Sequence, residues 1–265
     1  KEEYGNFCNY HIRNMEKNLK KRLKEETLYG TFVPFALGDV ADYTSRLGFD
    51  FIIIDNEHGI MNQETIFDMI RAAQCQRTPV LVRCTNSTPD MIHKVLDMGA
   101  EGILVPVINT AEDAREVLKS ALYPPMGERG IAYFTRASSY GMIEDKTEFL
   151  KKANEEVFIS IQLETGAAIE NLDEILEVEG IDMFFIGPND LAASLGLPNS
   201  HPEMGRIIKE TIDKITAKGK TAGIFVTDDE TARKYTGYGA KLILTSITKY
   251  LTQGVKEYLR KAKNS

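Results

Sequence analysis

Short apolar segments rich in Ile, Val and Phe recur along the chain, without a regular alternation of apolar and polar residues. They are too short for buried helices, and unbroken apolar character is typical of parallel strands covered on both faces. This pattern predicts eight strands, at Thr31–Leu37, Phe51–Ile54, Val80–Val82, Ile103–Val107, Val157–Leu163, Met183–Ile186, Thr221–Val226 and Lys241–Thr245.

The stretches between these strands have apolar residues three and four positions apart, as in amphipathic helices. The helices predicted in this way are Thr65–Ala73, Pro89–Met98, Ala111–Leu122, Ala167–Leu176, Met204–Ala217 and Asp229–Tyr235. Glycine follows several helical stretches, as at Gly99 and Gly239, which is the usual position of a helix C-cap. Alternating strands and helices predict an α/β fold whose parallel strands are joined by right-handed crossovers.

Both a closed (β/α)8 TIM barrel and an open, doubly wound sheet fit this alternation. Two observations favour the barrel. No strand is followed by the GxGxxG or GxxxxGK[ST] loop of nucleotide-binding open sheets. Polar candidate residues also follow the second, third, fifth and sixth strands, and a ring gathers these more readily than an open edge. We expect a single barrel domain at residues 16–265, preceded by a polar N-terminal extension at residues 1–15.

Composition narrows the range of functions. The formal net charge of −7 argues against a protein that binds nucleic acid or anionic membranes. The three cysteines show no CxxC spacing, which fits reduced thiols and offers no zinc motif. No apolar stretch reaches membrane-spanning length and no signal peptide opens the sequence, so we expect a cytoplasmic protein.

The segment between Tyr123 and Glu156 is too long for an ordinary connection. It suits a lid over the site or an arm that reaches a neighbouring subunit. Its arginines, Arg129 and Arg136, suit either a distal substrate group or a subunit interface.

Carboxylates at the ends of two predicted strands are candidate metal ligands. Glu164 and Asp190 offer hard oxygen atoms, which suit Mg²⁺, Mn²⁺ or Co²⁺. The competing interpretation is structural, because Asp190 precedes Leu-Ala-Ala as a helix N-cap would.

Asp55, His58 and Arg83 also follow strands. An Asp three residues before a His can bond one ring nitrogen and raise the basicity of the other. Arg83 is placed to bind a carboxylate or an enolate oxygen, or to pair with Glu57 or Glu164. The strand-associated lysines stand at strand beginnings, which disfavours a Schiff-base mechanism and favours a metal as electron sink.

Six segments occur in an order and at a spacing that resemble the HpcH/HpaI aldolase family, the metal-dependent pyruvate aldolases that act on 4-hydroxy-2-oxo acids. The resemblance extends from about Leu19 to about Leu259. Its segments are Gly48-Phe49-Asp50-Phe51 leading to Asp55-x-Glu57-His58, Val82-Arg83, Leu104-Val105-Pro106, Tyr123-Pro124-Pro125-x-Gly127-x-Arg129-Gly130, Gln162-x-Glu164-Thr165 and Gly187-Pro188-x-Asp190-Leu191.

The resemblance implies a role for each matched residue. Glu164 and Asp190 would hold a divalent metal, and Arg83 would stabilise the pyruvate enolate. His58, paired with Asp55, would take the proton of the substrate's 4-hydroxyl through a water on the metal. Substrate carboxylate binding would fall to Gln162 and to the backbone around Pro188, Asn189 and Asp190. The resemblance also implies a homohexamer, built as a trimer of dimers, in which the last helix is exchanged between neighbours.

The chain departs from the family pattern at Asn56, where many members have Gly, and at Thr245-Ser246-Ile247-Thr248, where they have a Gly-Val-Asp type of motif. Two further functions compete with the aldolase. One is a CoA-ester lyase of the wider superfamily, and the other is a non-catalytic barrel that binds an oxo acid or serves as an assembly subunit.

Overall fold

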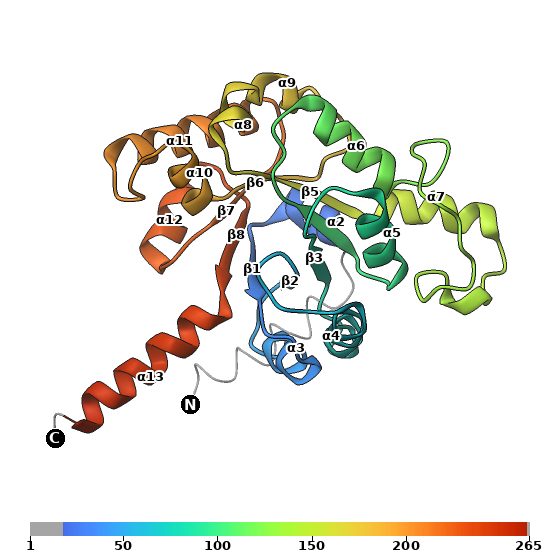
Figure 1. Ribbon diagram of the computed structural model, residues 1–265, viewed down its shortest axis with the longest axis horizontal. Helices are drawn as coiled ribbons and strands as arrows, with labels where there is room; N and C mark the ends of the chain where they lie inside the picture. The colour runs from blue at the N-terminus through green and yellow to red at the C-terminus, as the bar shows by residue number, and fades with distance from the viewer. Residues whose placement is uncertain (1–17, 264–265) are drawn as a thin grey trace.

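Eight parallel strands close into a barrel in chain order, with β8 paired to β1 (Figure 1). The computed structural model describes residues 18–263, so the extension expected at residues 1–15 lies outside the described residues. The strands are β1 (Leu28–Val33), β2 (Phe51–Asp55), β3 (Val80–Arg83), β4 (Gly102–Val105), β5 (Phe158–Leu163), β6 (Met183–Ile186), β7 (Ala222–Phe225) and β8 (Leu242–Ser246). The barrel prediction is confirmed and the open sheet is excluded.

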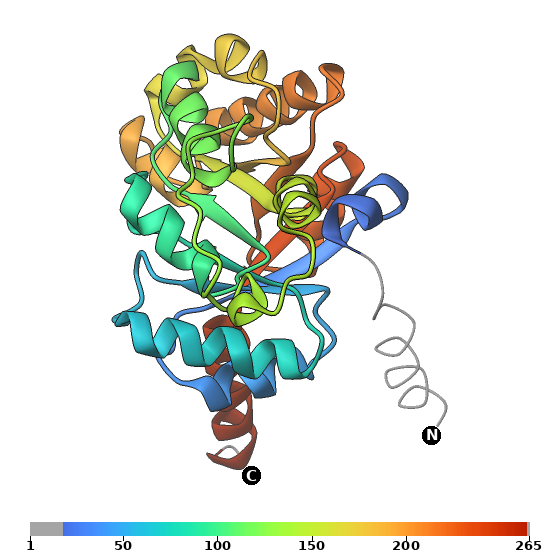
Figure 2. The ribbon, with the colours of Figure 1, turned by 90° about the vertical axis from the view of Figure 1, so that its right-hand side faces the viewer.

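Most helices follow strands and surround the barrel, whereas α2 precedes β1 and α13 extends away from the barrel (Figures 1 and 2). They are α2 (Leu19–Glu25), α3 (Gly38–Ser45), α4 (Gln63–Cys75), α5 (Pro89–Asp97), α6 (Ala111–Ala121), α7 (Lys146–Glu156), α8 (Gly166–Glu170), α9 (Leu172–Leu176), α10 (Pro188–Ser194), α11 (Pro202–Ala217), α12 (Asp229–Gly237) and α13 (Ile247–Lys263), with a 3₁₀ turn η1 at Ser139–Gly141. None of the helices in this part of the chain is long and apolar enough to cross a membrane.

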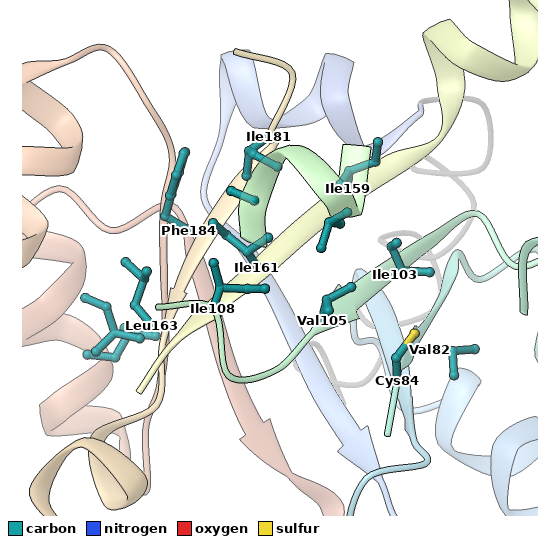
Figure 3. Packing of buried hydrophobic residues seen from close by; sticks show 14 of the residues in the cluster. Val82, Cys84, Ile103, Val105, Ile108, Ile159, Ile161, Leu163, Ile181 and Phe184 are labelled. Carbon is teal, nitrogen blue, oxygen red and sulfur yellow. The ribbon is translucent and has the colours of Figure 1, made fainter. Parts of the chain in front are cut away.

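Strand side chains divide between two apolar clusters, because successive residues of a strand point to opposite faces. The outer cluster fills the space between strands and helices, and Figure 3 shows part of it, including Ile103, Ile161 and Phe184. The inner cluster fills the barrel and includes Phe51 and Leu244. Gly30 belongs to this inner wall, where a Cβ atom would lie 2.4 Å from the Phe51 ring. Only glycine leaves room for that ring, which fills the barrel interior beside it.

Helix α2 covers the amino-terminal end of the barrel, and its Leu19 and Leu23 join the inner cluster. Its Arg22 is almost fully buried and bonds the equally buried Asp50. The second oxygen of Asp50 accepts the backbone N–H of Tyr29 at 2.8 Å. This end of the barrel is therefore closed by a buried ion pair.

The long segment between α6 and β5 lies at the same, amino-terminal rim, because it follows a helix and precedes a strand. Arg129 bonds Asp97 at 2.7 Å, and Arg136 contacts Gln74 and the carbonyl of Met98, all at the carboxyl ends of α4 and α5. Chemistry in this fold belongs to the opposite rim. The prediction that this segment forms a lid over the chain's own site is therefore wrong. Its position still allows it to be an arm that reaches a neighbouring subunit.

Candidate active site

Four polar side chains that end or follow strands meet at the carboxyl-terminal rim, together with the first turn of α10. Asp55 ends β2, Arg83 ends β3, Gln162 lies near the end of β5, and Glu164 comes directly after β5. A cavity of about 250 Å³ opens here, and its lining includes Asp55, His58, Arg83, Gln162 and the segment Gly187–Asp190. The structure thus brings the predicted residues of four strands to one site, with buried Glu164 beside it.

The Arg83 guanidinium is held between two carboxylates. Its Nε and Nη2 donate to the two oxygens of Asp55 at 3.0 and 2.8 Å, a geometry that the direct pairing of Asp55 with Arg83 across β2 and β3 makes possible. Its Nη1 lies 3.1 Å from Oε2 of Glu57. The guanidinium also stacks over the Phe32 ring, 4.6 Å from the ring centroid. These contacts fix both the plane and the direction of the arginine fork.

His58 meets Asp55 through its backbone rather than through its ring. Its N–H donates to Oδ1 of Asp55 at 3.2 Å, while the imidazole Nε2 lies 3.9 Å from Oε2 of Glu57. The His58 side chain is 64% exposed and lines the cavity. The ring bond that the spacing of Asp55 and His58 suggested would therefore need a different side-chain position.

Glu164 is buried and held by two donors. Its Oε1 accepts the backbone N–H of Val107 at 2.8 Å, and its Oε2 contacts the Gln162 side-chain amide. Burial raises the pKa of Glu164, and the negative charges of Glu57 and Asp190 raise it further. Several carboxylates thus crowd this rim, a charge pattern that a divalent cation relieves.

Asp190 stands in the first turn of α10, where Gly187 is the N-cap residue. The interpretation of Asp190 as the N-cap is therefore wrong, and its side chain lines the cavity instead. A Cβ atom on Gly187 would lie 3.2 Å from Cβ of Glu164 and 3.3 Å from Nε2 of Gln162. Glycine at this position lets α10 start close to Glu164.

The residues present fit a divalent cation. Glu164 and Asp190 supply hard oxygens, and the buried Oε1 of Gln162 has no hydrogen-bond partner among residues 18–263. In the same described range, no group of three or more His, Cys, Asp and Glu side chains could hold a metal ion. A cation here would therefore draw on two carboxylates together with water or substrate oxygens, as Mg²⁺ often does.

Two polar residues of the site were not among the predicted site residues, although Glu57 was named as a possible partner of Arg83 and the structure shows that ion pair. Glu57 has a buried Oε2 that is near Arg83 but lacks an aligned hydrogen bond, and burial, the largest cause, raises its pKa. Ser246 ends β8 and lines the cavity. Arg83 was identified as a polar residue at the end of a strand, and the same criterion would have identified Ser246.

Comparison with known proteins agrees with this geometry. The family model of the HpcH/HpaI aldolase/citrate lyase family matches residues 28–251. The 2-keto-3-deoxy-L-rhamnonate aldolase of Klebsiella pneumoniae is 37% identical over 241 residues, which cover 89% of each chain.

Solved structures give the same answer. A family member from Burkholderia cenocepacia superposes with a TM-score of 0.87 at 29% identity, covering 92% of this chain and 98% of that one. An HpcH/HpaI aldolase from Desulfitobacterium hafniense superposes with a TM-score of 0.87 at 28% identity, covering 94% and 97%. The chain described here belongs to the HpcH/HpaI aldolase/citrate lyase family.

Proposed function

We propose that the chain is a class II aldolase, an aldehyde-lyase of the EC 4.1.2 type, that reversibly cleaves 4-hydroxy-2-oxo acids to pyruvate and an aldehyde. The observation that carries the proposal is the cavity at the carboxyl-terminal rim, where a fixed guanidinium, an exposed imidazole and acidic oxygens converge. The family depends on divalent metals. Relatives named as 2-keto-3-deoxy-L-rhamnonate aldolases support a sugar-acid substrate.

The proposed metal ligands are Glu164 and Asp190, with Mg²⁺, Mn²⁺ or Co²⁺ as the cation. When bound, the cation supplies an electron sink for the 2-keto group. Gln162, Pro188 and Asn189 line the same cavity, and we assign the side-chain N–H of Gln162 and the backbone N–H of Asn189, after Pro188, to orienting the substrate carboxylate.

His58 acts as the base in the proposed reaction, and Arg83 stabilises the negative charge that develops. His58 takes the proton of the 4-hydroxyl group, the C3–C4 bond breaks, and its electron pair passes into the enolate of pyruvate. Arg83 stabilises the enolate oxygen, and Asp55 holds the guanidinium in place by its two hydrogen bonds. The aldehyde leaves, and protonation of the enolate at C3 gives pyruvate.

The test is pyruvate release from a panel of 4-hydroxy-2-oxo acids, including 2-keto-3-deoxy-L-rhamnonate, coupled to lactate dehydrogenase. We expect EDTA to abolish release and Mg²⁺ or Mn²⁺ to restore it. Glu164→Ala should remove metal-dependent turnover, whereas Glu170→Ala, an exposed carboxylate on α8, should not. If folded, metal-loaded protein released no pyruvate, a CoA-ester lyase or an oxo-acid-binding barrel would replace the aldolase.

We also propose that the protein is a cytoplasmic homohexamer, a trimer of dimers that exchanges α13 between neighbours. Helix α13 extends away from the barrel (Figure 1). Large apolar side chains on it are exposed, namely Tyr250, Leu251, Val255, Tyr258 and Leu259. Light scattering after gel filtration tests the proposal, and a monomer at micromolar concentration would refute it.

A further inference from the structure

The cavity has a polar half and an aromatic half. The polar half is formed by Asp55, His58, Arg83, Gln162 and the segment Gly187–Asp190, and the aromatic half by Phe185, Phe225, Ser246 and Phe32. Phe32 lies where the two halves meet, because the Arg83 guanidinium stacks over its ring. The sheet places Ser246 directly beside Phe32. The acidic and keto groups of an oxo acid suit the polar half, so the aldehyde fragment is left to the aromatic half.

Ser246 supplies the hydroxyl group of this aromatic half, and this hydroxyl is hydrogen-bonded to a neighbouring residue. Its Oγ lies 2.7 Å from Oγ1 of Thr248, and either atom can donate in that contact. Two hydroxyls carry two protons, and the contact between them uses one. The pair therefore keeps one proton and free lone pairs with which to bind a ligand hydroxyl.

Charge also limits the aldehyde fragment. Arg83 is the one Lys or Arg side chain that lines the described cavity, and carboxylates of Asp55 and Glu57 already surround it. A second carboxylate on the substrate would find no lysine or arginine to pair with in this lining. An uncharged fragment with a short carbon end suits the cavity of about 250 Å³ and the rings of Phe32 and Phe225.

We propose, resting on the aldolase function above, that Ser246 determines specificity. Its hydroxyl, held by Thr248, hydrogen-bonds the 2-hydroxyl of a short, uncharged 2-hydroxyaldehyde whose carbon end lies against Phe32 and Phe225. Ser246 ends β8 at the rim of the cavity, and Thr248 follows it two residues later in α13.

The test is aldol addition of pyruvate to two aldehydes by the full chain with Mg²⁺. Lactaldehyde carries the 2-hydroxyl, and propanal lacks it. We expect Ser246→Ala to lower kcat/KM for lactaldehyde about tenfold, mostly through KM, and to change that for propanal less than about twofold. Thr248→Val should give a smaller loss of the same kind, about threefold, because the Ser246 hydroxyl keeps its own proton but loses its support. Ser200→Ala, on an exposed loop, is the matched control.

Equal losses for both aldehydes would show a structural role for Ser246 and overturn the proposal, as would unchanged kinetics with both. Wild-type protein that used succinic semialdehyde, which carries a carboxylate, as well as lactaldehyde would overturn the charge argument. Each of these results leaves the aldolase function standing. Absence of any adduct or of any pyruvate release from metal-loaded wild-type protein would instead refute the aldolase itself.

Discussion

Replacing Arg22 by Met should destabilise the protein while leaving the active site intact. Met keeps the aliphatic stem that packs at the closed end of the barrel but removes the guanidinium. The side chains of Arg22 and Asp50 are 2% and 3% exposed. Among residues 18–263, the buried Asp50 carboxylate would then keep only the Tyr29 N–H as a hydrogen-bond partner. We expect the free energy of unfolding to fall and kcat at 25 °C to stay the same.

The size of the effect follows from this burial. Breaking a buried ion pair by removing one partner costs about 3–5 kcal/mol. The second partner of Arg22, Glu26, is 39% exposed, and its bond at 2.8 Å adds under about 1 kcal/mol. A loss of about 4 kcal/mol in a chain of this length lowers Tm by roughly 10 °C.

Urea and thermal unfolding followed by circular dichroism, at fixed protein concentration, measure the change. The control is Arg206→Met, because Arg206 on α11 pairs with Glu203 and Glu210 at an exposed site and should cost under about 1 kcal/mol. The double variant Arg22→Met with Asp50→Asn should regain much of the loss, since no buried charge is left. An Arg22→Met protein as stable as the control would refute the reasoning.

Three further predictions concern the site, a buried carboxylate and the thiols. Arg83→Lys loses the two-pronged bond to Asp55, so we expect kcat for pyruvate release to fall roughly 10²-fold; a loss confined to KM would contradict this. Burial raises the pKa of Asp182 above its ordinary value of 3.8, so its contribution to stability is present at low pH and is lost as pH rises through the raised pKa. Asp182→Asn should therefore flatten the pH dependence of unfolding in urea above pH 3.8, and an unchanged slope would count against it. Burial raises the pKa of the Cys84 thiol to about 12, so iodoacetamide at pH 8 should label exposed Cys75 and spare Cys84 in native protein, as peptide mass spectrometry would show.

The strand pattern predicted the barrel because strands covered on both faces are apolar without interruption. The first strand was misplaced: it was predicted at Thr31–Leu37, whereas β1 is Leu28–Val33. Gly30 resembles a break in the sequence, yet it is the point where the Phe51 ring fills the barrel. The contact between Gly30 and Phe51 on the neighbouring strand explains why β1 includes Gly30, and the local apolar pattern does not reveal this contact.

Several helices were not predicted from the apolar pattern, for two different reasons, although the family resemblance implied a last helix. Helix α3 is short and carries acidic residues, so its apolar spacing is weak. Helix α13 does show the spacing, with Leu251, Val255 and Tyr258 four and three residues apart, but these side chains are exposed in the structure. In α13 the apolar spacing therefore marks a helix face that no other part of this barrel covers in the described structure.

The sequence indicated which residues gather at the site better than it indicated which of them contact each other. Spacing places Asp55 near His58, but the spacing alone does not show that Asp55 bonds Arg83 with both oxygens. That bond depends on the register of β2 and β3, which sets Asp55 opposite Arg83. Residue types at strand ends are thus readable from the sequence, whereas their partners depend on how neighbouring strands align.

The crowding of charge at the carboxyl-terminal rim has a kinetic consequence. Asp55 and Glu57 pair with the Arg83 guanidinium there, and the charges of Glu57 and Asp190 also act on Glu164. An oxo acid is itself an anion, so it is repelled from this rim until a cation balances the carboxylates. We therefore expect a compulsory order of binding, with cation before oxo acid, and weak, salt-enhanced capture of the substrate by metal-free protein.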